Sequence, residues 1–154
     1  MGSKKLEFKQ EFLRDCYDEA QELLQMHWTE VALNKDAIKL NPDIEQYEEA
    51  EKAGCLRIFT ARADGLLVGY FALIVQRSLH YMDHAFATND VIFLHPDHRR
   101  GYAARKLIEF ATQCLEQDGC SMLFINTKVH KPFDMLLGRM GFDHIENVYA
   151  KRLI

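Results

Sequence analysis

The sequence contains no long apolar run, and this absence limits where the protein can reside. None of its hydrophobic stretches approaches the roughly 18 consecutive apolar residues that a membrane-spanning helix needs. Its opening residues, MGSKKLEF, also lack the apolar core of a secretory signal peptide. We therefore expect a cytoplasmic protein with no membrane partner.

Positive charge is scarce as well. The chain has 19 Lys and Arg residues against 23 Asp and Glu residues, which gives a formal net charge of -4 at pH 7. Nucleic acids and anionic membranes select proteins with a broad basic face. The charge balance therefore argues against a nucleic-acid partner, and any basic patch must be local.

Cysteine is rare and irregularly spaced. The four cysteines form no CxxC pair, so we interpret them as reduced, mostly buried thiols rather than as a redox or zinc motif. His80 and His84, with Asp83 between them, fall in a predicted loop that has no helix to align them as metal ligands. We expect no metal site.

Linkers, repeats and low-complexity segments are also missing. The chain has 154 residues, of which 48% are hydrophobic, and this is enough apolar material for one core. We therefore expect one domain over residues 1–154.

The apolar spacing that is present predicts an α/β fold, with a mixed sheet flanked by helices. Asp64-Gly65 between two β-rich runs is a strong hairpin signal, and the run Val91 to Leu94 is apolar on both faces, as in a central strand. In chain order we predict a strand at 4–10, a helix from about 11 to 26, a helix at 43–52, two strands around 63–65, a loop at 78–88, a central strand at 91–94, a helix from 104 that closes at 118–119, a strand at 120–127, a helix from 132 to 140, and one or two strands after 142.

One segment, DVIFLHPDHRRGYAARKLIEFA at 90–111, combines a buried strand, a basic turn and a helix start. The first turn of a helix leaves unpaired N–H donors and carries the positive end of the helix dipole, so such a turn can cradle an anion. Four Lys or Arg residues and no acid lie between His98 and Lys106. The segment predicts a ligand with a phosphate or pyrophosphate, and a solvated basic turn is the alternative. Neither GxxxxGK[ST] nor GxGxxG is present.

The same segment resembles motif A of the GCN5-related N-acetyltransferase (GNAT) superfamily, in which an apolar strand is followed by x-Pro-x-x-[Gln/Arg]-x-x-Gly-x-[Gly/Ala] and a helix. Pro96, Arg99 and Ala104 match this pattern without gaps. Tyr102 stands where the pattern has its fixed Gly, two positions before the final [Gly/Ala], and Gly101 lies one residue earlier.

A second segment, HKPFDMLLGRMGF at 130–142, resembles the family's motif B, Asn-x-x-Ala-x-x-Leu-Tyr-x-x-x-Gly-Phe. Leu136, Gly141 and Phe142 match it. His130 stands at the Asn place, Phe133 at the Ala place and Leu137 at the Tyr place. The order of elements across nearly the whole chain is also that of the family, and the compact form is similar to members met in bacteriophage and prophage genomes.

The resemblance implies the GNAT fold, a central mixed, mostly antiparallel sheet of six to seven strands flanked by about four helices. It also implies that acetyl-CoA, or another acyl-CoA, lies where the fourth and fifth strands splay apart. Val91, Ile92 and Phe93 would then pair with the pantetheine arm through their backbone. The pyrophosphate would be wrapped by Arg99, Arg100, Gly101, Tyr102, Ala103 and Ala104.

Direct attack of an amine on a thioester needs a group that removes the amine's proton. Asp90, which opens the central strand on the same face as Thr88 and Ile92, is the first candidate for this base, and His80 is the alternative. His130 or a water could protonate the thiolate in place of the family's Tyr. For the acceptor we expect an aromatic wall and a carboxylate from Trp28 and Glu30, with Tyr81 nearby.

The resemblance therefore predicts an acyltransferase that moves an acetyl group to the primary amine of a small molecule or protein. The alternative is a GNAT-fold module that binds acyl-CoA or another protein without catalysis. The sequence leaves both a monomer and a homodimer open.

Overall fold

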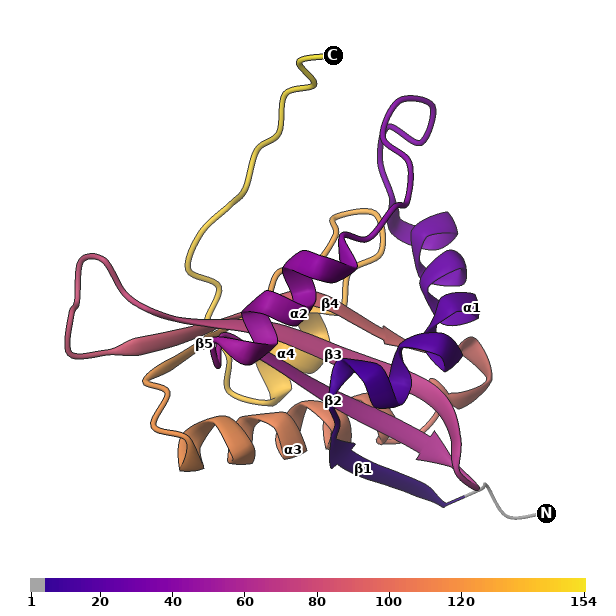
Figure 1. The fold of residues 1–154 in the computed structure, drawn as a ribbon, viewed down its shortest axis with the longest axis horizontal. Helices are drawn as coiled ribbons and strands as arrows, with labels where there is room; N and C mark the ends of the chain where they lie inside the picture. The colour runs from indigo at the N-terminus through magenta and orange to yellow at the C-terminus, as the bar shows by residue number, and fades with distance from the viewer. Residues whose placement is uncertain (1–4) are drawn as a thin grey trace.

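The computed structural model describes residues 5–154, and its centre is one five-stranded sheet (Figure 1). Its strands are β1 (Leu6–Gln10), β2 (Leu56–Ala63), β3 (Leu66–Arg77), β4 (Ala85–Leu94) and β5 (Met122–Phe124). The strand order follows the chain, the first four strands pair antiparallel, and β5 pairs parallel with β4. The expected mixed, mostly antiparallel sheet is thus confirmed.

Helices cover both faces of this sheet (Figure 1). They are α1 (Leu13–Val31), α2 (Ile44–Lys52), α3 (Ala103–Gln117) and α4 (Asp134–Arg139). The apolar sides of α1 and α2 share one core cluster with β2 and β3, and those of α3 and α4 share another on the opposite face. Because each strand alternates its side chains between these clusters, the central strands are buried on both faces.

Helix α1 runs further than its apolar spacing predicts. We expected it to end near Met26, but it continues to Val31 and ends at Ala32. Its last turns contain no Gly or Pro that would stop it. Their inward residues are His27 and Trp28, which line a cavity instead of packing into the core, so the apolar period fades while the helix continues.

One turn and one helix cap have the conformation that their local sequence predicts. Asp64 and Gly65 both take positive φ, 50° and 82°, as a two-residue type I′ hairpin turn requires. Asp43 caps α2 by accepting a hydrogen bond from the backbone N–H of Gln46 at 3.1 Å. The predicted loop at 78–88 is shorter in the structure, since β4 already begins at Ala85.

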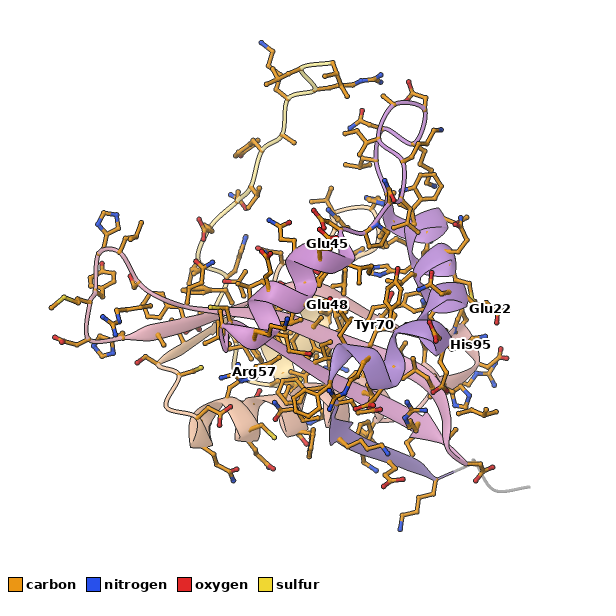
Figure 2. The ribbon with its side chains drawn as sticks, viewed as in Figure 1. Glu22, Glu45, Glu48, Arg57, Tyr70 and His95 are labelled. Carbon is orange, nitrogen blue, oxygen red and sulfur yellow. The ribbon has the colours of Figure 1, made fainter. Side chains whose placement is uncertain are left out.

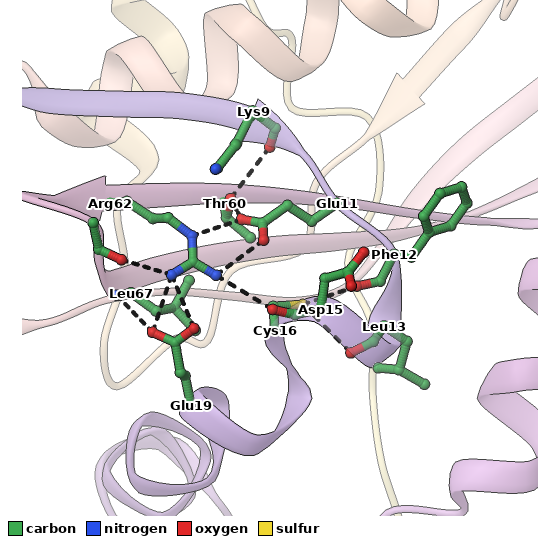
Figure 3. Close-up of polar contacts among 11 residues, drawn as sticks. Lys9, Glu11, Phe12, Leu13, Asp15, Cys16, Glu19, Thr60, Arg62 and Leu67 are labelled. Carbon is green, nitrogen blue, oxygen red and sulfur yellow. Dashed lines mark hydrogen bonds and ion pairs between the residues drawn. The ribbon is translucent and has the colours of Figure 1, made fainter.

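A buried ion-pair network holds the junction between the end of β1 and the start of α1 (Figure 3). The Arg62 guanidinium donates two hydrogen bonds of 2.9 Å to the carboxylate of Glu11 and also bonds Glu19 at 2.9 Å. The hydroxyl of Thr60 donates to Glu11 as well. The network therefore ties the start of α1 to the β2–β3 hairpin.

The final strands expected after residue 142 are absent from the described chain, so the sheet has five strands and not six or seven. Residues 143–154 form an extended tail that leaves the body beyond α4 (Figure 1). A strand persists only when a neighbouring backbone pairs with it. The tail finds no such neighbour in its own molecule, because no backbone hydrogen bond joins it to the rest of the described residues.

No helix in the described part of the chain is long and apolar enough to cross a membrane.

Candidate functional site

The main cavity lies where β4 and β5 part. The two strands pair only from Phe86–Met122 to Thr88–Phe124. Beyond that point a cavity of about 640 Å³ opens between them. Its walls come from β4, the C-terminal half of α1, the start of α3 and the loop between β5 and α4; they are residues 24, 27, 28, 30–32, 40, 89–94, 99, 104, 108, 126, 128, 131–133 and 136.

Asn89 holds the two strands at the point of divergence. Its side-chain oxygen accepts a hydrogen bond from the backbone N–H of Asn126 at 2.7 Å, and its amide donates to the Asn126 carbonyl at 3.4 Å. These two hydrogen bonds lie just beyond the last β4–β5 residue pair and mark where the two strands separate. From Val91 onward, the edge of β4 that faces away from β3 has no strand partner in the described chain and faces the cavity.

A β-bulge sets the direction of Asp90. In the β3–β4 ladder Leu73 pairs with Asn89 and Ala72 pairs with Val91, so Asp90 is an extra residue. Strict alternation predicts Asp90 on the face of both Thr88 and Ile92. That prediction is wrong for Ile92, because the bulge reverses the alternation: Val91 packs with the α1 and α2 cluster, whereas Ile92 packs with α3.

Asp90 has a partner that the sequence analysis did not identify. The Tyr47 hydroxyl, on α2, donates a short hydrogen bond to the Asp90 carboxylate. Burial first, and then this hydrogen bond, raise the pKa of Tyr47, so the phenol stays protonated as the donor. Asp90 lines the cavity, and its carboxylate is thereby oriented from the α2 side.

The end of α1 supplies an imidazole to the cavity wall. His27 Nδ1 lies 3.0 Å from the Tyr70 hydroxyl, and its ring stacks on Phe93 at a centroid distance of 5.0 Å. Tyr70 lies between α1 and α2 (Figure 2). Burial is the largest effect and lowers the pKa of His27; the charge of Glu30 opposes this shift, and the charge of Arg99 adds to it. His27 is therefore a neutral residue of the wall at pH 7.

Trp28 and Glu30, predicted for the acceptor, both line the cavity. Glu30, however, is paired with Arg99, which was predicted for the pyrophosphate: the guanidinium bonds its two oxygens at 2.9 and 2.7 Å. Hydrogen bonding from Arg99 outweighs burial and lowers the pKa of Glu30. Arg99 also donates to the Leu94 carbonyl at 2.8 Å and lies over the Phe93 ring. It therefore clamps the turn after β4 onto α1.

The basic turn opens into α3 as the sequence indicates. Gly101 takes the left-handed conformation with φ of 76°, so Tyr102 adopts an ordinary negative φ and needs no glycine in its place. The Tyr102 ring is 72% exposed and does not line the cavity. Helix α3 has no side-chain cap at its start and no acid in its first turn. Its first backbone bond is donated by Lys106, so the preceding N–H groups are open to an anion.

The residues predicted for the cofactor divide into two groups. The cavity lining includes Val91, Ile92, Phe93, Arg99 and Ala104. Arg100, Gly101, Tyr102 and Ala103 stand outside it on the turn and the first residue of α3.

Two other predicted residues lie far from Asp90. His80 and Tyr81 are at the exposed tip of the long β3–β4 hairpin, outside the cavity lining (Figure 1). Strands β3 and β4 extend beyond the cavity before the chain turns between Arg77 and Ala85. The predicted loop at 78–88 would have placed this turn closer to Asp90. The structure therefore does not bring His80 and Tyr81 to the cavity.

His130 is exposed on the loop between β5 and α4 and is not part of the cavity lining. Its Nε2 is 3.0 Å from the carbonyl of Val31, so it joins the β5–α4 loop to the end of α1. The neighbouring Lys128 and Lys131 line the cavity and were not predicted, because Lys128 precedes the motif B segment and Lys131 occupies a position that the motif leaves open. Leu137, at the family's Tyr place, is buried in the α3 core cluster and offers no proton.

The described chain contains no group of three or more His, Cys, Asp or Glu residues that could hold a metal ion.

The fold is similar to several solved acetyltransferases. The ribosomal-protein-alanine N-acetyltransferase from Brucella melitensis biovar Abortus 2308 superposes with a TM-score of 0.72 at 24% identity, over 97% of this chain and 99% of that one. The aminoglycoside N-acetyltransferase AAC(6')-Iy in complex with CoA gives 0.70 at 20% identity, over 99% and 97%. A predicted acetyltransferase with acetyl-CoA from Clostridium acetobutylicum gives 0.71 at 9% identity, over 96% of both chains.

A comparison with curated proteins finds no match. The model of the acetyltransferase (GNAT) family, in contrast, matches residues 13–142, which span α1 to the end of motif B. This range contains the whole cavity lining described above. The chain belongs to the acetyltransferase (GNAT) family.

Proposed function

We propose that this protein is an acetyl-CoA-dependent N-acetyltransferase that acts as one domain on a primary amine. The observation that carries the proposal is the cavity between β4 and β5, which joins an unpaired strand edge to an uncapped helix start and has the Asp90 carboxylate in its wall. The predictions of a cytoplasmic location and of kinship with bacteriophage-type members remain expectations from the sequence.

The donor half of the cavity suits an extended amide chain that ends in a pyrophosphate. The free backbone edge at Val91 to Phe93 can pair with the amides of a pantetheine arm, as a further strand would. The N–H groups at the start of α3 can receive the pyrophosphate, with Arg100 beside them. Acetyl-CoA, when bound, supplies the activated acetyl thioester.

Arg99 acts in this proposal mainly as a clamp. Its guanidinium already bonds Glu30 and the Leu94 carbonyl, so most of its donors are engaged within the protein. Its role is to hold the turn after β4 in the shape that exposes the α3 start. Glu30 likewise lines the acceptor side of the cavity, and the positive charge of Arg99 neutralises its carboxylate.

Asp90 is the proposed base. The acceptor is an ammonium ion at neutral pH, and the carboxylate can attract it and remove a proton directly or through water. The amine nitrogen then bonds to the thioester carbon, the carbon–sulfur bond breaks, and the thiolate takes up a proton. His130, on the β5–α4 loop next to the cavity-lining Lys131, or a water serves for that last proton, since Leu137 has none to give.

The acceptor is an amine of a small molecule or of a protein. Two observations favour a cation: the Trp28 ring in the cavity wall and the Asp90 carboxylate beyond it. The structural neighbours include acetyltransferases named for aminoglycosides and for a ribosomal-protein alanine, so both acceptor classes belong in a screen.

The test is an incubation with acetyl-CoA and a panel of aminoglycosides, polyamines and peptides with free N-termini, read as released thiol. Turnover with any amine above the slow hydrolysis of acetyl-CoA supports the proposal. If the protein binds CoA in a calorimetric titration but acetylates no member of the panel, the binding module that lacks catalysis replaces the enzyme. If it binds neither, the cavity assignment is wrong.

A further inference from the structure

A second, smaller cavity lies between the sheet and the two helices α1 and α2, on the face opposite α3. Its volume is about 70 Å³, and its lining residues are 13, 16, 17, 20, 24, 42, 47, 58, 67, 70, 72 and 91. Tyr17, Pro42 and Tyr47 are only half-buried, whereas the residues from β2 and β3 are buried. The small cavity therefore has its floor on the sheet and opens between α1 and α2.

The interior of the small cavity offers little to a water molecule. The hydroxyls of Tyr47 and Tyr70 already have hydrogen-bond partners. The Cys16 thiol donates to a backbone carbonyl of α1 at 3.8 Å. Tyr17 lies at the opening, and the other lining side chains are aliphatic. Because a buried water needs two to four polar partners, this space favours an apolar occupant.

The small cavity adjoins the proposed base. Leu24 and Val91 line both this cavity and the main one. Tyr47, at the opening of the small cavity, donates its hydrogen bond to Asp90, which lines the main cavity. A cation paired with the Asp90 carboxylate thus lies at the boundary, with the apolar space on its α2 side and the cavity assigned to acetyl-CoA on its β5 side.

We propose that the small cavity receives the carbon chain of the acceptor, so that the acceptor is a primary amine on a short, unsubstituted aliphatic chain. This inference rests on the proposed acetyl transfer and adds the class of acceptor. The ammonium group pairs with Asp90, and the chain lies between α1 and α2.

The size of the small cavity limits the length of that chain. At about 10–15 Å³ for each water-sized sphere, its 70 Å³ has room for roughly five to seven spheres, which corresponds to a chain of about four carbons. A polyhydroxylated acceptor fits poorly, because its hydroxyls would be buried there without partners.

The experiment compares the n-alkylamines from methylamine to hexylamine as acceptors at saturating acetyl-CoA. Each methylene that enters the cavity should raise kcat/KM by roughly fourfold, so butylamine should exceed methylamine by roughly 60-fold, with no further rise beyond about five carbons. Ethanolamine has the size of propylamine but should be the poorer acceptor, because its hydroxyl finds no partner.

Two variants test whether this preference comes from the small cavity. Ala20→Leu fills the cavity from α1 and should remove most of the advantage of butylamine over methylamine. Ala50→Leu is the matched control: Ala50 packs on the same core cluster but outside the cavity lining, so the advantage should remain. If Ala20→Leu does not fold, Ala72→Val fills the same space from β3 and replaces it in the comparison.

Thermal scans without acetyl-CoA measure binding separately from turnover. Butylamine should raise Tm more than methylamine does at the same concentration. Turnover with equal kcat/KM along the series, or a butylamine advantage that survives the filled cavity, would overturn the acceptor class and leave acetyl transfer intact. A chain-length-dependent rise in Tm without turnover of any amine would contradict acetyl transfer and still support the small cavity as the binding site. Neither turnover nor such a rise would overturn both.

Discussion

At the scale of single residues, the most informative contact joins α2 to the bulge in β4. The Tyr47 hydroxyl and the Asp90 carboxylate come from positions 43 residues apart. The bulge turns Asp90 out of the strand's alternation, and the phenol holds the carboxylate that faces the cavity. A carboxylate fixed in this way can meet an amine in one orientation, which is what general-base catalysis requires.

The substitution Asp90→Asn tests this role directly. It keeps the size of the side chain and removes its basicity, so we expect kcat to fall by roughly 10- to 1000-fold while acetyl-CoA affinity barely changes. Tyr47→Phe keeps the ring and loses only the hydroxyl, and a smaller fall in kcat is expected. Steady-state kinetics measure both variants. His80→Gln is the control, since His80 lies outside the cavity; a large loss there with an active Asp90→Asn enzyme would move the base to His80.

The ion-pair network makes a prediction about acid. Burial alone raises the pKa of Glu11, but the hydrogen bonds from Arg62 and Thr60, together with the charge of Arg62, lower it below its ordinary value of 4.5. The folded protein thus holds this proton more weakly than the unfolded chain does. The stability that Glu11 contributes is complete above about pH 4.5 and is lost as the pH falls through the lowered pKa.

Glu11→Gln should therefore lower the free energy of unfolding by about 3 kcal/mol at pH 7, because it removes one partner of a buried ion pair. The loss should shrink below pH 4. Urea titrations at several pH values measure it. In Glu19→Gln the altered side chain is 43% exposed, and the loss should stay near 1 kcal/mol. Equal losses for the two variants would mean that the buried pair is no stronger than the partly exposed one.

At the scale of elements, the turn between β4 and α3 determines whether the helix start is open. Gly101 alone in this turn has a positive φ, and a Cβ placed there would meet no atom within 4 Å. Strain, not collision, is thus the cost of a side chain at this position.

Gly101→Ala should cost about 1 to 2 kcal/mol of stability and should also weaken acetyl-CoA binding, because relief of the strain displaces the α3 start. Gly138→Ala in α4 is the matched control: it has equal free space and no positive φ, so it should leave binding unchanged. Thermal unfolding and calorimetric titration give the two quantities. If affinity is the same in both variants, the turn does not hold the cofactor.

Most elements could be predicted because their signals are local. The Asp64-Gly65 turn, the Asp43 cap and the stop of α3 before Gly119 all depend on residues next to one another. The tail and the bulge could not be predicted in this way. A strand at 143–154 depends on a partner backbone, and the position of Asp90 depends on how β3 pairs with β4.

The candidate site was predictable to the same extent. The open strand edge at Val91 to Phe93 and the basic turn lie within one continuous segment, residues 90–111, which carries the match to motif A. The pairing of Arg99 with Glu30 joins residues 69 positions apart, and the sequence assigned them to different ligands. His27 was missed because a histidine on an amphipathic helix carries no signal of what it faces.

At the scale of the whole molecule, a ligand in the cavity should stabilise the fold, because the residues that line the cavity come from elements between α1 and α4 that are assembled only in the folded chain. At 100 times its dissociation constant a ligand adds about 2.7 kcal/mol. For a protein of this size acetyl-CoA should then raise Tm by roughly 5 to 10 °C. Thermal scans with increasing acetyl-CoA measure the shift, and Arg99→Ala should require a higher concentration for the same rise. No shift at any concentration would contradict cofactor binding.

The order of the strands has a consequence for folding kinetics. The β2–β3 and β3–β4 pairings close across short turns, whereas β4 and β5 meet only after all of α3 has been traversed, and over three residue pairs. Local pairings form early and distant ones late. The β1–β2 pairing is more distant still, but it extends over five residue pairs. Because the β4–β5 seam is both distant and short, we expect it to form late and to open first, so the amides of Met122 to Phe124 should exchange with solvent faster than those of β3. The cavity between β4 and β5 is then a part of the chain that matures late after synthesis, and under the proposed function acetyl-CoA would be the molecule that completes it.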